Sequence, residues 1–132
     1  MARSSARPLS PHLTIWKMGI HMFISIFNRV MGVGLATVGV VALVWWLTAA
    51  ASGKDAYDLF LVWANSWIGY VFAVGLTFAF FFHLCMGLRH FVMDVGAGFE
   101  LGANRQWAWV TVAASVLCTA GVWLVILQKV IV

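Results

Sequence analysis

The chain alternates between long apolar runs and short polar segments. Three runs contain no Asp, Glu, Lys or Arg: Val30–Ala51, Leu59–Leu88 and Gln106–Gln128. Each is long enough for a helix that crosses the hydrocarbon of a bilayer, which takes about 20 residues. The runs are continuous, whereas the strands of a membrane barrel would alternate apolar and polar residues. The pattern therefore predicts an all-α membrane protein with three transmembrane helices.

The turn residues and charges around these runs suggest their bounds. We expect spans at about 23–51, 59–88 and 105–129, all within a single domain 1–132. No helix breaker separates "SIFNRVMG" from the first run, so this helix is expected to begin near Gly19–Ser25. Residues 1–22 carry both prolines and then mix apolar and polar residues, which is typical of a segment at the membrane surface. The first ten residues, "MARSSARPLS", lack the apolar stretch of a secretory signal, so no cleavage of the N-terminus is expected.

Composition agrees with a membrane location, and the distribution of charge predicts the orientation. Of the 132 residues, 64% are hydrophobic and only 9% are charged, which is too few to cover a water-soluble globule. Basic residues gather before the first span and around the 89–105 loop, with fewer in the turn near Lys54 and at Lys129. By the positive-inside rule, the N-terminus lies in the cytoplasm and the C-terminus in the periplasm of a bacterial-type inner membrane. The net charge of +4 therefore reflects topology, and no nucleic acid partner is expected.

One face of the second predicted helix carries polar residues that are unusual in a bilayer. His83, Gly87, His90 and Asp94 fall on one stripe of a helix that advances about 100° per residue. His83 lies about 9 Å inward of Arg89 by helical rise, so an ionisable side chain enters the hydrocarbon. Two interpretations stay open. The imidazole either satisfies itself with one hydrogen bond to a neighbouring helix or binds a metal or haem iron.

Iron ligation by His83 would require a second chain or an empty axial position. His83 and His90 point the same way about 10.5 Å apart along the helix. Axial nitrogens, by contrast, lie on opposite faces of a macrocycle, each about 2 Å from the metal. His12 and His21 belong to the surface segment and so lie at the wrong depth. A hetero-oligomer is therefore expected if iron is bound.

The first predicted helix presents a matching stripe of polar and small residues. It consists of Ser25, Arg29, Gly32, Ala36 and Gly39. One interpretation is an interfacial arginine anchor followed by a packing seam. The other is a pair of donors, a hydroxyl and a guanidinium one turn apart, that hydrogen bonds to a carbonyl or carboxylate group arriving from the membrane.

Three motifs in this order, "RPLSPHLTIW", "SIFNRVMG" and "HLCMGLRHFVMD", resemble the cytochrome b subunits of succinate dehydrogenase, the larger membrane anchors of respiratory complex II. The resemblance implies half of a heterodimeric haem-binding helical bundle. In it His83 is an axial ligand of haem b, and the smaller membrane anchor supplies the other histidine. It also implies that Ser25 and Arg29 help to form a ubiquinone site beside the iron-sulfur subunit.

Succinate chemistry would belong to partner subunits, so no catalytic residue is expected here. FAD and the iron-sulfur clusters would be carried by the flavoprotein and the iron-sulfur subunit. This chain has neither a Gly-rich dinucleotide fingerprint nor a cysteine cluster. Haem propionates would meet Arg29, His90 and Asn28 at the cytoplasmic side, with Asp94 close by. Asn28 stands where family members commonly carry His and cannot titrate. The alternatives are an anchor of a quinol:fumarate reductase and a non-redox structural membrane subunit.

Overall fold

The computed structural model describes residues 16–131, and these contain helices but no strands. The elements are α1 (Ile20–Gly34), a π-helical turn η1 (Leu35–Gly39), α2 (Val40–Ser52), α3 (Lys54–Ala64), α4 (Trp67–Asp94) and α5 (Leu101–Ile131). The all-α prediction is confirmed. Most of the predicted surface segment, about 1–22, lies outside the described residues, which begin only four positions before α1.

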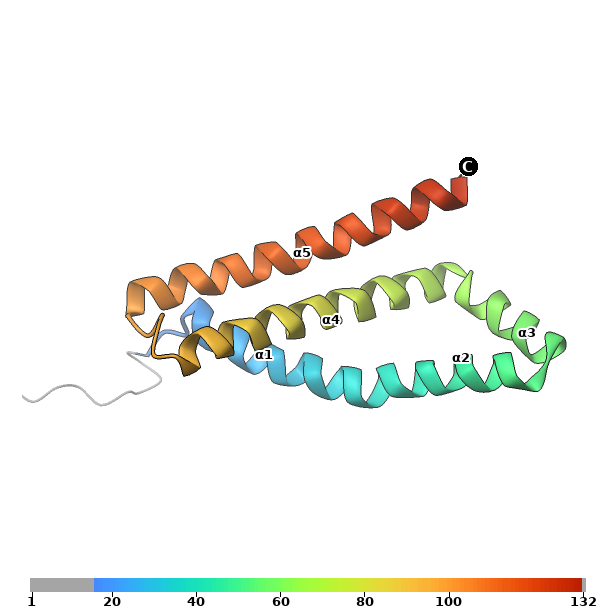
Figure 1. Ribbon diagram of the computed structural model, residues 1–132, viewed down its shortest axis with the longest axis horizontal. Coiled ribbons are helices and arrows are strands. Elements are labelled where there is room, and N and C mark those ends of the chain that lie inside the picture. Colours follow the sequence, from blue (N-terminus) through green and yellow to red (C-terminus); the bar gives the residue numbers. More distant parts are fainter. Residues whose placement is uncertain (1–15, 132) are drawn as a thin grey trace, which may run out of the picture.

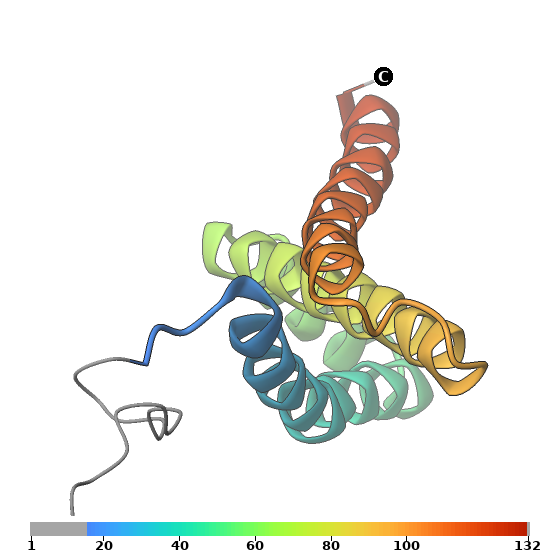
Figure 2. The ribbon, with the colours of Figure 1, turned by 90° about the vertical axis from the view of Figure 1, so that its left-hand side faces the viewer.

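The helices form an elongated up-and-down bundle in which α4 is central. α1, η1 and α2 run in one direction, α3 turns the chain around, α4 returns, and α5 runs back again (Figure 1). α4 contacts α1, η1, α3 and α5. Seen from the end where α1 begins, α5 lies on the opposite side of α4 from α2, while α1 also contacts α5 (Figure 2). We call this the N-terminal end of the bundle; α4 ends and α5 begins there as well.

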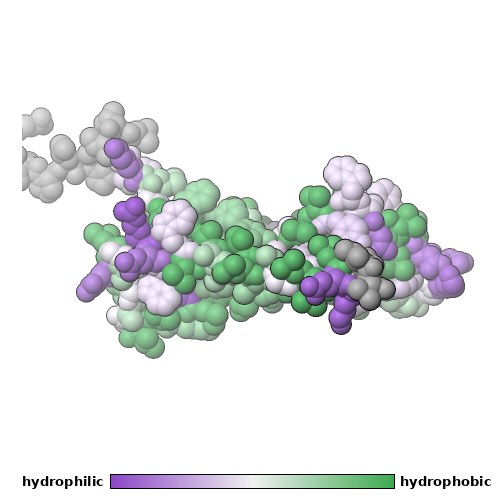
Figure 3. Space-filling model, turned by 90° about the horizontal axis from the view of Figure 1, so that it is seen from above, coloured by the Kyte–Doolittle hydropathy of each residue, from purple (hydrophilic) through white to green (hydrophobic). Residues whose placement is uncertain are grey.

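Three helical segments are long and apolar enough to cross a membrane: Ile20–Ser52, Trp67–Asp94 and Leu101–Lys129. Hydrophilic residues gather at the two ends of the molecule, and the surface between them is mostly apolar (Figure 3). Many large apolar side chains, such as Val41, Val62 and Leu117, are exposed on this surface. Hydrocarbon or another apolar chain is therefore the medium that suits it.

The apolar run Leu59–Leu88 does not form one helix. α3 ends at Ala64, and Ser66 adopts an extended backbone conformation that caps the start of α4. The Ser66 hydroxyl accepts a hydrogen bond from the N–H of Gly69 at 3.1 Å and donates to the carbonyl of Trp63 at 2.7 Å. Ser is a preferred N-cap residue, yet hydropathy alone does not register a cap inside an uncharged run. Glycine is required at position 69, because a Cβ there would lie 2.3 Å from the Trp63 carbonyl oxygen.

The loop predicted at 89–105 is shorter in the structure. α4 continues to Asp94 and α5 begins at Leu101, so charged residues lie within the helices. Gly96 and Gly98 turn the chain with φ angles of 84° and 80°, a region that favours glycine. Arg89 does not end α4, and its guanidinium bonds to the side chain of Asn104 near the start of α5.

The tightest packing lies toward the N-terminal end. Ile24 of α1, Phe82 and Met86 of α4, and Ala108 of α5 are almost fully buried against one another. The Phe27 ring of α1 meets Phe82 edge to face, with centroids 5.0 Å apart. This cluster fixes the rotation of α1 and α4 about their axes.

Small polar residues let α5 approach α4 closely. Thr111, Ser115 and Thr119 are buried at successive turns, and each hydroxyl donates to the carbonyl four residues earlier. Such self-satisfied hydroxyls leave no unpaired donor in an apolar interface, and small side chains allow helix backbones to approach.

We predict that Gly69→Ala destabilises the protein, because the added methyl group would collide with a backbone carbonyl that cannot move away without breaking the turn. The expected loss is about 1–3 kcal/mol or more. Gly75→Ala is the matched control, since a Cβ there meets nothing within 4 Å. The apparent melting temperature of the detergent-solubilised protein measures the effect. Equal melting temperatures for the two variants would contradict the prediction.

Candidate functional site

His83 and Asn28 meet between α4 and α1. The Nδ1 atom of His83 lies 3.0 Å from Oδ1 of Asn28, within hydrogen-bond distance. His83 is exposed on the surface of this chain, and Asn28 is half-buried. The sequence predicted both residues at a haem site, and in the structure this hydrogen bond joins them.

The aromatic core explains why these two residues meet. Phe27 and Phe82 are in edge-to-face contact, and Asn28 and His83 are the next residue on each helix. A step of about 100° around each axis carries both side chains from the core to the rim of the same helix interface. The packing of the two phenylalanines therefore sets the register that brings the amide to the imidazole.

Gly32 makes the second contact of α1 with the imidazole. A Cβ at this position would lie 2.9 Å from Cε1 and 3.3 Å from Nδ1 of His83. Since real Cβ atoms essentially never approach another heavy atom within 3.0 Å, any larger residue would displace the ring. Gly32 is one turn from Asn28, so one glycine and one amide of the same helix face hold the imidazole.

The hydrogen bond determines which ring nitrogen carries the proton. An amide oxygen can only accept, so Nδ1 of His83 donates to Asn28 and the neutral ring keeps a lone pair on Nε2. No described residue donates a hydrogen bond to Nε2. A Cβ added to Gly87, on the same face of α4, would meet nothing within 4 Å, so this surface is open beyond the ring. The arrangement suits an electron-pair acceptor that approaches from outside the chain.

A metal held by protein ligands alone is not supported within residues 16–131. No group of three or more His, Cys, Asp and Glu side chains there could hold an ion. An iron already held by the four nitrogens of a macrocycle needs only an axial ligand from the protein. One accessible imidazole nitrogen meets that need, so the residues present fit a haem better than a bare metal ion.

The remaining residues nominated by the sequence stay apart from one another. Ser25 and Arg29 are exposed one turn apart on α1, and His90 and Asp94 are exposed near the end of α4. The hydrogen bonds of the described residues do not link any of these four side chains. The structure therefore brings Asn28, described above, to His83 and leaves these four available to other molecules.

Sequence reasoning missed the role of Arg89. Its guanidinium Nη2 donates to Oδ1 of Asn104 at 2.8 Å, and Nη1 lies 3.7 Å from the sulfur of Met86. The arginine thus ties the end of α4 to the start of α5. The only sequence signal for this pair is that Arg89 and Asn104 lie on either side of the short turn that contains Gly96 and Gly98.

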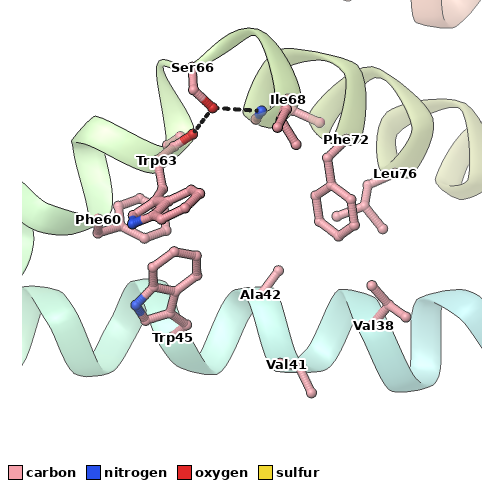
Figure 4. Close-up of a pocket in the computed structure, with 13 residues that line it drawn as sticks. Val38, Val41, Ala42, Trp45, Phe60, Trp63, Ser66, Ile68, Phe72 and Leu76 are labelled. Atoms are coloured by element: carbon pink, nitrogen blue, oxygen red, sulfur yellow. Dashed lines mark hydrogen bonds between the residues drawn. The ribbon is translucent and has the colours of Figure 1, made fainter.

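An apolar cavity lies at the other end of the bundle (Figure 4). It has a volume of about 380 Å³ between α2, α3 and α4, and its lining includes Trp45, Phe60, Trp63 and Phe72. Its one hydroxyl, that of Ser66, is engaged in the cap of α4. No titratable side chain lines it, so it offers room for apolar groups but no chemistry.

Comparison with known proteins gives one consistent family. The profile of the succinate dehydrogenase/fumarate reductase transmembrane subunit family matches residues 3–122. The chain is 38% identical to the succinate dehydrogenase cytochrome b556 subunit of Rickettsia felis over 117 residues, 89% of this chain and 90% of the relative. It is 34% identical to the cytochrome b556 subunit of Paracoccus denitrificans, covering 84% and 85%. It is 31% identical to the mitochondrial cytochrome b560 subunit of Sus scrofa, covering 89% and 70%.

We predict that Gly32→Ala weakens haem binding, because the new methyl group would push the His83 ring away from Asn28. Loss of such an orienting contact typically lowers metal affinity by about 10- to 100-fold. Gly34→Ala is the matched control on the same helix, since its Cβ would meet nothing within 4 Å. The haem-to-protein ratio after purification, read from the reduced-minus-oxidised absorption spectrum, measures the effect. Full haem content in Gly32→Ala would show that the contact is dispensable.

Proposed function

We propose that this chain, which belongs to the succinate dehydrogenase/fumarate reductase transmembrane subunit family, is the larger membrane anchor of a succinate:quinone oxidoreductase. The relatives compared above are named as succinate dehydrogenase subunits, which favours succinate oxidation over fumarate reduction. Membrane-spanning helices account for nearly all described residues, so succinate chemistry falls to partner subunits. Those partners are a flavoprotein with FAD and a subunit with iron-sulfur clusters.

The observation that carries the proposal is the state of His83. Its Nδ1–H is held by Asn28 while Nε2 is free on an exposed face. A histidine that ligates a metal commonly donates its other N–H to a carbonyl or carboxylate oxygen, which fixes the tautomer and the ring plane. His83 would thus hold haem b as one axial ligand. A haem supplies one-electron redox chemistry to the assembly when bound.

The second axial ligand would come from a smaller membrane anchor subunit. His90 lies two turns from His83 on α4, and His21 lies at the start of α1, so neither reaches the opposite face of a haem bound at His83. The exposed apolar surface of the spans also requires a partner chain or lipid to cover it. A haem shared between two anchors is consistent with both features.

Ser25 and Arg29 are proposed to bind the quinone near the N-terminal end. Both side chains are exposed, and they are one turn apart on α1. The guanidinium would donate a charge-assisted hydrogen bond to one quinone oxygen and stabilise negative charge that develops on it. The serine hydroxyl would donate a second bond. Water or an acid on a partner would deliver the two protons that accompany the two electrons.

The haem propionates would be met at the same end of the bundle. Arg29 and His90 are exposed there, and Asp94 lies one turn beyond His90. Asn28 uses its amide oxygen on His83, which leaves its amide N–H groups as donors to a propionate. We place this end on the cytoplasmic side of a bacterial-type inner membrane, with the C-terminus in the periplasm, because basic residues concentrate there.

The first test is His83→Ala in the assembled complex. We expect the haem absorption band to disappear while all subunits still co-purify, because His21 and His90, the other histidines of the described residues, lie at other depths. His21→Ala is the control that removes a different imidazole, and it should keep the band. A normal band in His83→Ala would remove the ligand assignment and favour a structural anchor.

The second test concerns quinone reduction. Removing the charged donor in Arg29→Ala should lower succinate:quinone activity by about 10- to 100-fold, and Ser25→Ala by about 2- to 10-fold. Succinate oxidation with a soluble artificial acceptor should stay normal. Ser52→Ala, at the far end of the same span, is the control for a lost hydroxyl. Parallel loss of both activities would indicate failed assembly and would contradict a quinone-binding role.

A further inference from the structure

We propose that Asn28 is a positioning residue that sets the proton and the ring plane of His83, and thereby the redox potential of a haem bound there. This inference rests on the proposed function, since it concerns the haem ligand. It goes beyond that function because it gives Asn28 a role toward the iron itself, separate from any contact with a propionate.

The geometry supports one orientation of the imidazole. Asn28 Oδ1 accepts from Nδ1 at 3.0 Å, and Gly32 packs against the Cε1 and Nδ1 side of the ring. A Cβ at position 32 would lie 3.8 Å from Nε2, so Nε2 is the most distant of the three ring atoms near Gly32. The ring is therefore held at its Nδ1–Cε1 edge, and Nε2 has no hydrogen-bond partner among the described residues.

No other described residue is hydrogen-bonded to the His83 ring. Its neighbours in sequence are Phe82, buried in the core, and Leu84, exposed on the apolar surface, and neither can accept a proton. In an apolar medium an N–H that loses its acceptor has no water to replace it. Without Asn28, nothing on this face would favour Nδ1 over Nε2 as the site of the proton.

The hydrogen bond also affects how strongly Nε2 can donate its electron pair to iron. An imidazole that donates its N–H to an oxygen becomes a more basic ligand. A more basic axial ligand stabilises ferric iron more than ferrous iron, so the midpoint potential falls. Removing the acceptor should therefore raise the potential, and strengthening it should lower the potential.

The experiment compares Asn28→Leu, Asn28→Asp and Thr37→Val in the purified complex. Leucine is neutral and of similar size but accepts nothing, whereas aspartate is a stronger acceptor. Thr37→Val is a control on the same span, because the Thr37 hydroxyl bonds only the carbonyl of Val33. Haem content, the midpoint potential and the ferric low-spin electron paramagnetic resonance spectrum are measured for each.

We expect a higher potential in Asn28→Leu, a lower one in Asn28→Asp and no change in Thr37→Val. A tenfold preferential loss of affinity for ferric haem corresponds to a rise of about 59 mV. The resonance spectrum of Asn28→Leu should also change, since its g values depend on the planes of the axial imidazoles. A purely structural role would not move the potential in opposite directions in the two variants.

The results that would contradict this proposal differ from the result that would contradict the proposed function. An unchanged potential and spectrum in a fully loaded Asn28→Leu complex would overturn the proposal, as would shifts of the same sign in both variants. If Asn28→Leu loses its haem, Asn28→Asp decides: retained haem with a lower potential supports the role, and loss in both contradicts it. A wild-type complex that lacks haem would instead contradict the proposed function.

Discussion

A side chain that cannot reach water must find its hydrogen-bond partner within the protein, and this constraint explains the hydrogen bonds of several polar residues in the spans. Thr37, Thr77 and Thr111 satisfy it locally, by donating to a carbonyl one turn earlier. Groups that cannot do so link different helices, as Asn28 links to His83 and Arg89 to Asn104. These two hydrogen bonds join α4 to α1 and to α5. The same contacts therefore satisfy the polar side chains and hold the helices together.

The two ends of the bundle are built differently. Toward the N-terminal end, Ile24, Phe82, Met86 and Ala108 pack three helices into one buried cluster. At the other end an apolar cavity lies between α2 and α4 (Figure 4), while Tyr70 of α4 and Trp123 of α5 are in ring contact, with centroids 6.1 Å apart. Rigid packing is what a ligand-holding side chain requires, because its orientation depends on the supporting residues. The pair of His83 and Asn28 lies beside this buried cluster, since each follows one of its packed phenylalanines in sequence.

Sequence predicted most of the fold because lipid permits so few structures. Continuous apolar runs can only be helices, and the depth of His83 marked it as exceptional. The break at Ser66 was not predicted, since a serine cap inside an apolar run depends on the close approach of Gly69 to a carbonyl. The partner of His83 was not predicted either. It depends on the rotation of two helices, which the Phe27 and Phe82 contact sets and no spacing reveals.

Under the proposed function, this chain would carry half of a coordination site, and the hydrogen bond between His83 and Asn28 would prepare that half within the chain itself. In the neutral imidazole, the bond to Oδ1 of Asn28 favours the tautomer with the proton on Nδ1 and the lone pair on Nε2. Because the ligand must be neutral and unprotonated at the metal-binding atom, this tautomer removes one step from cofactor binding. A haem ligated by two chains would bind only their assembled form, so it would stabilise that assembly by mass action. The hydrogen bond between Asn28 and His83 would then support the assembly of the membrane anchors as well as the electronic properties of the iron.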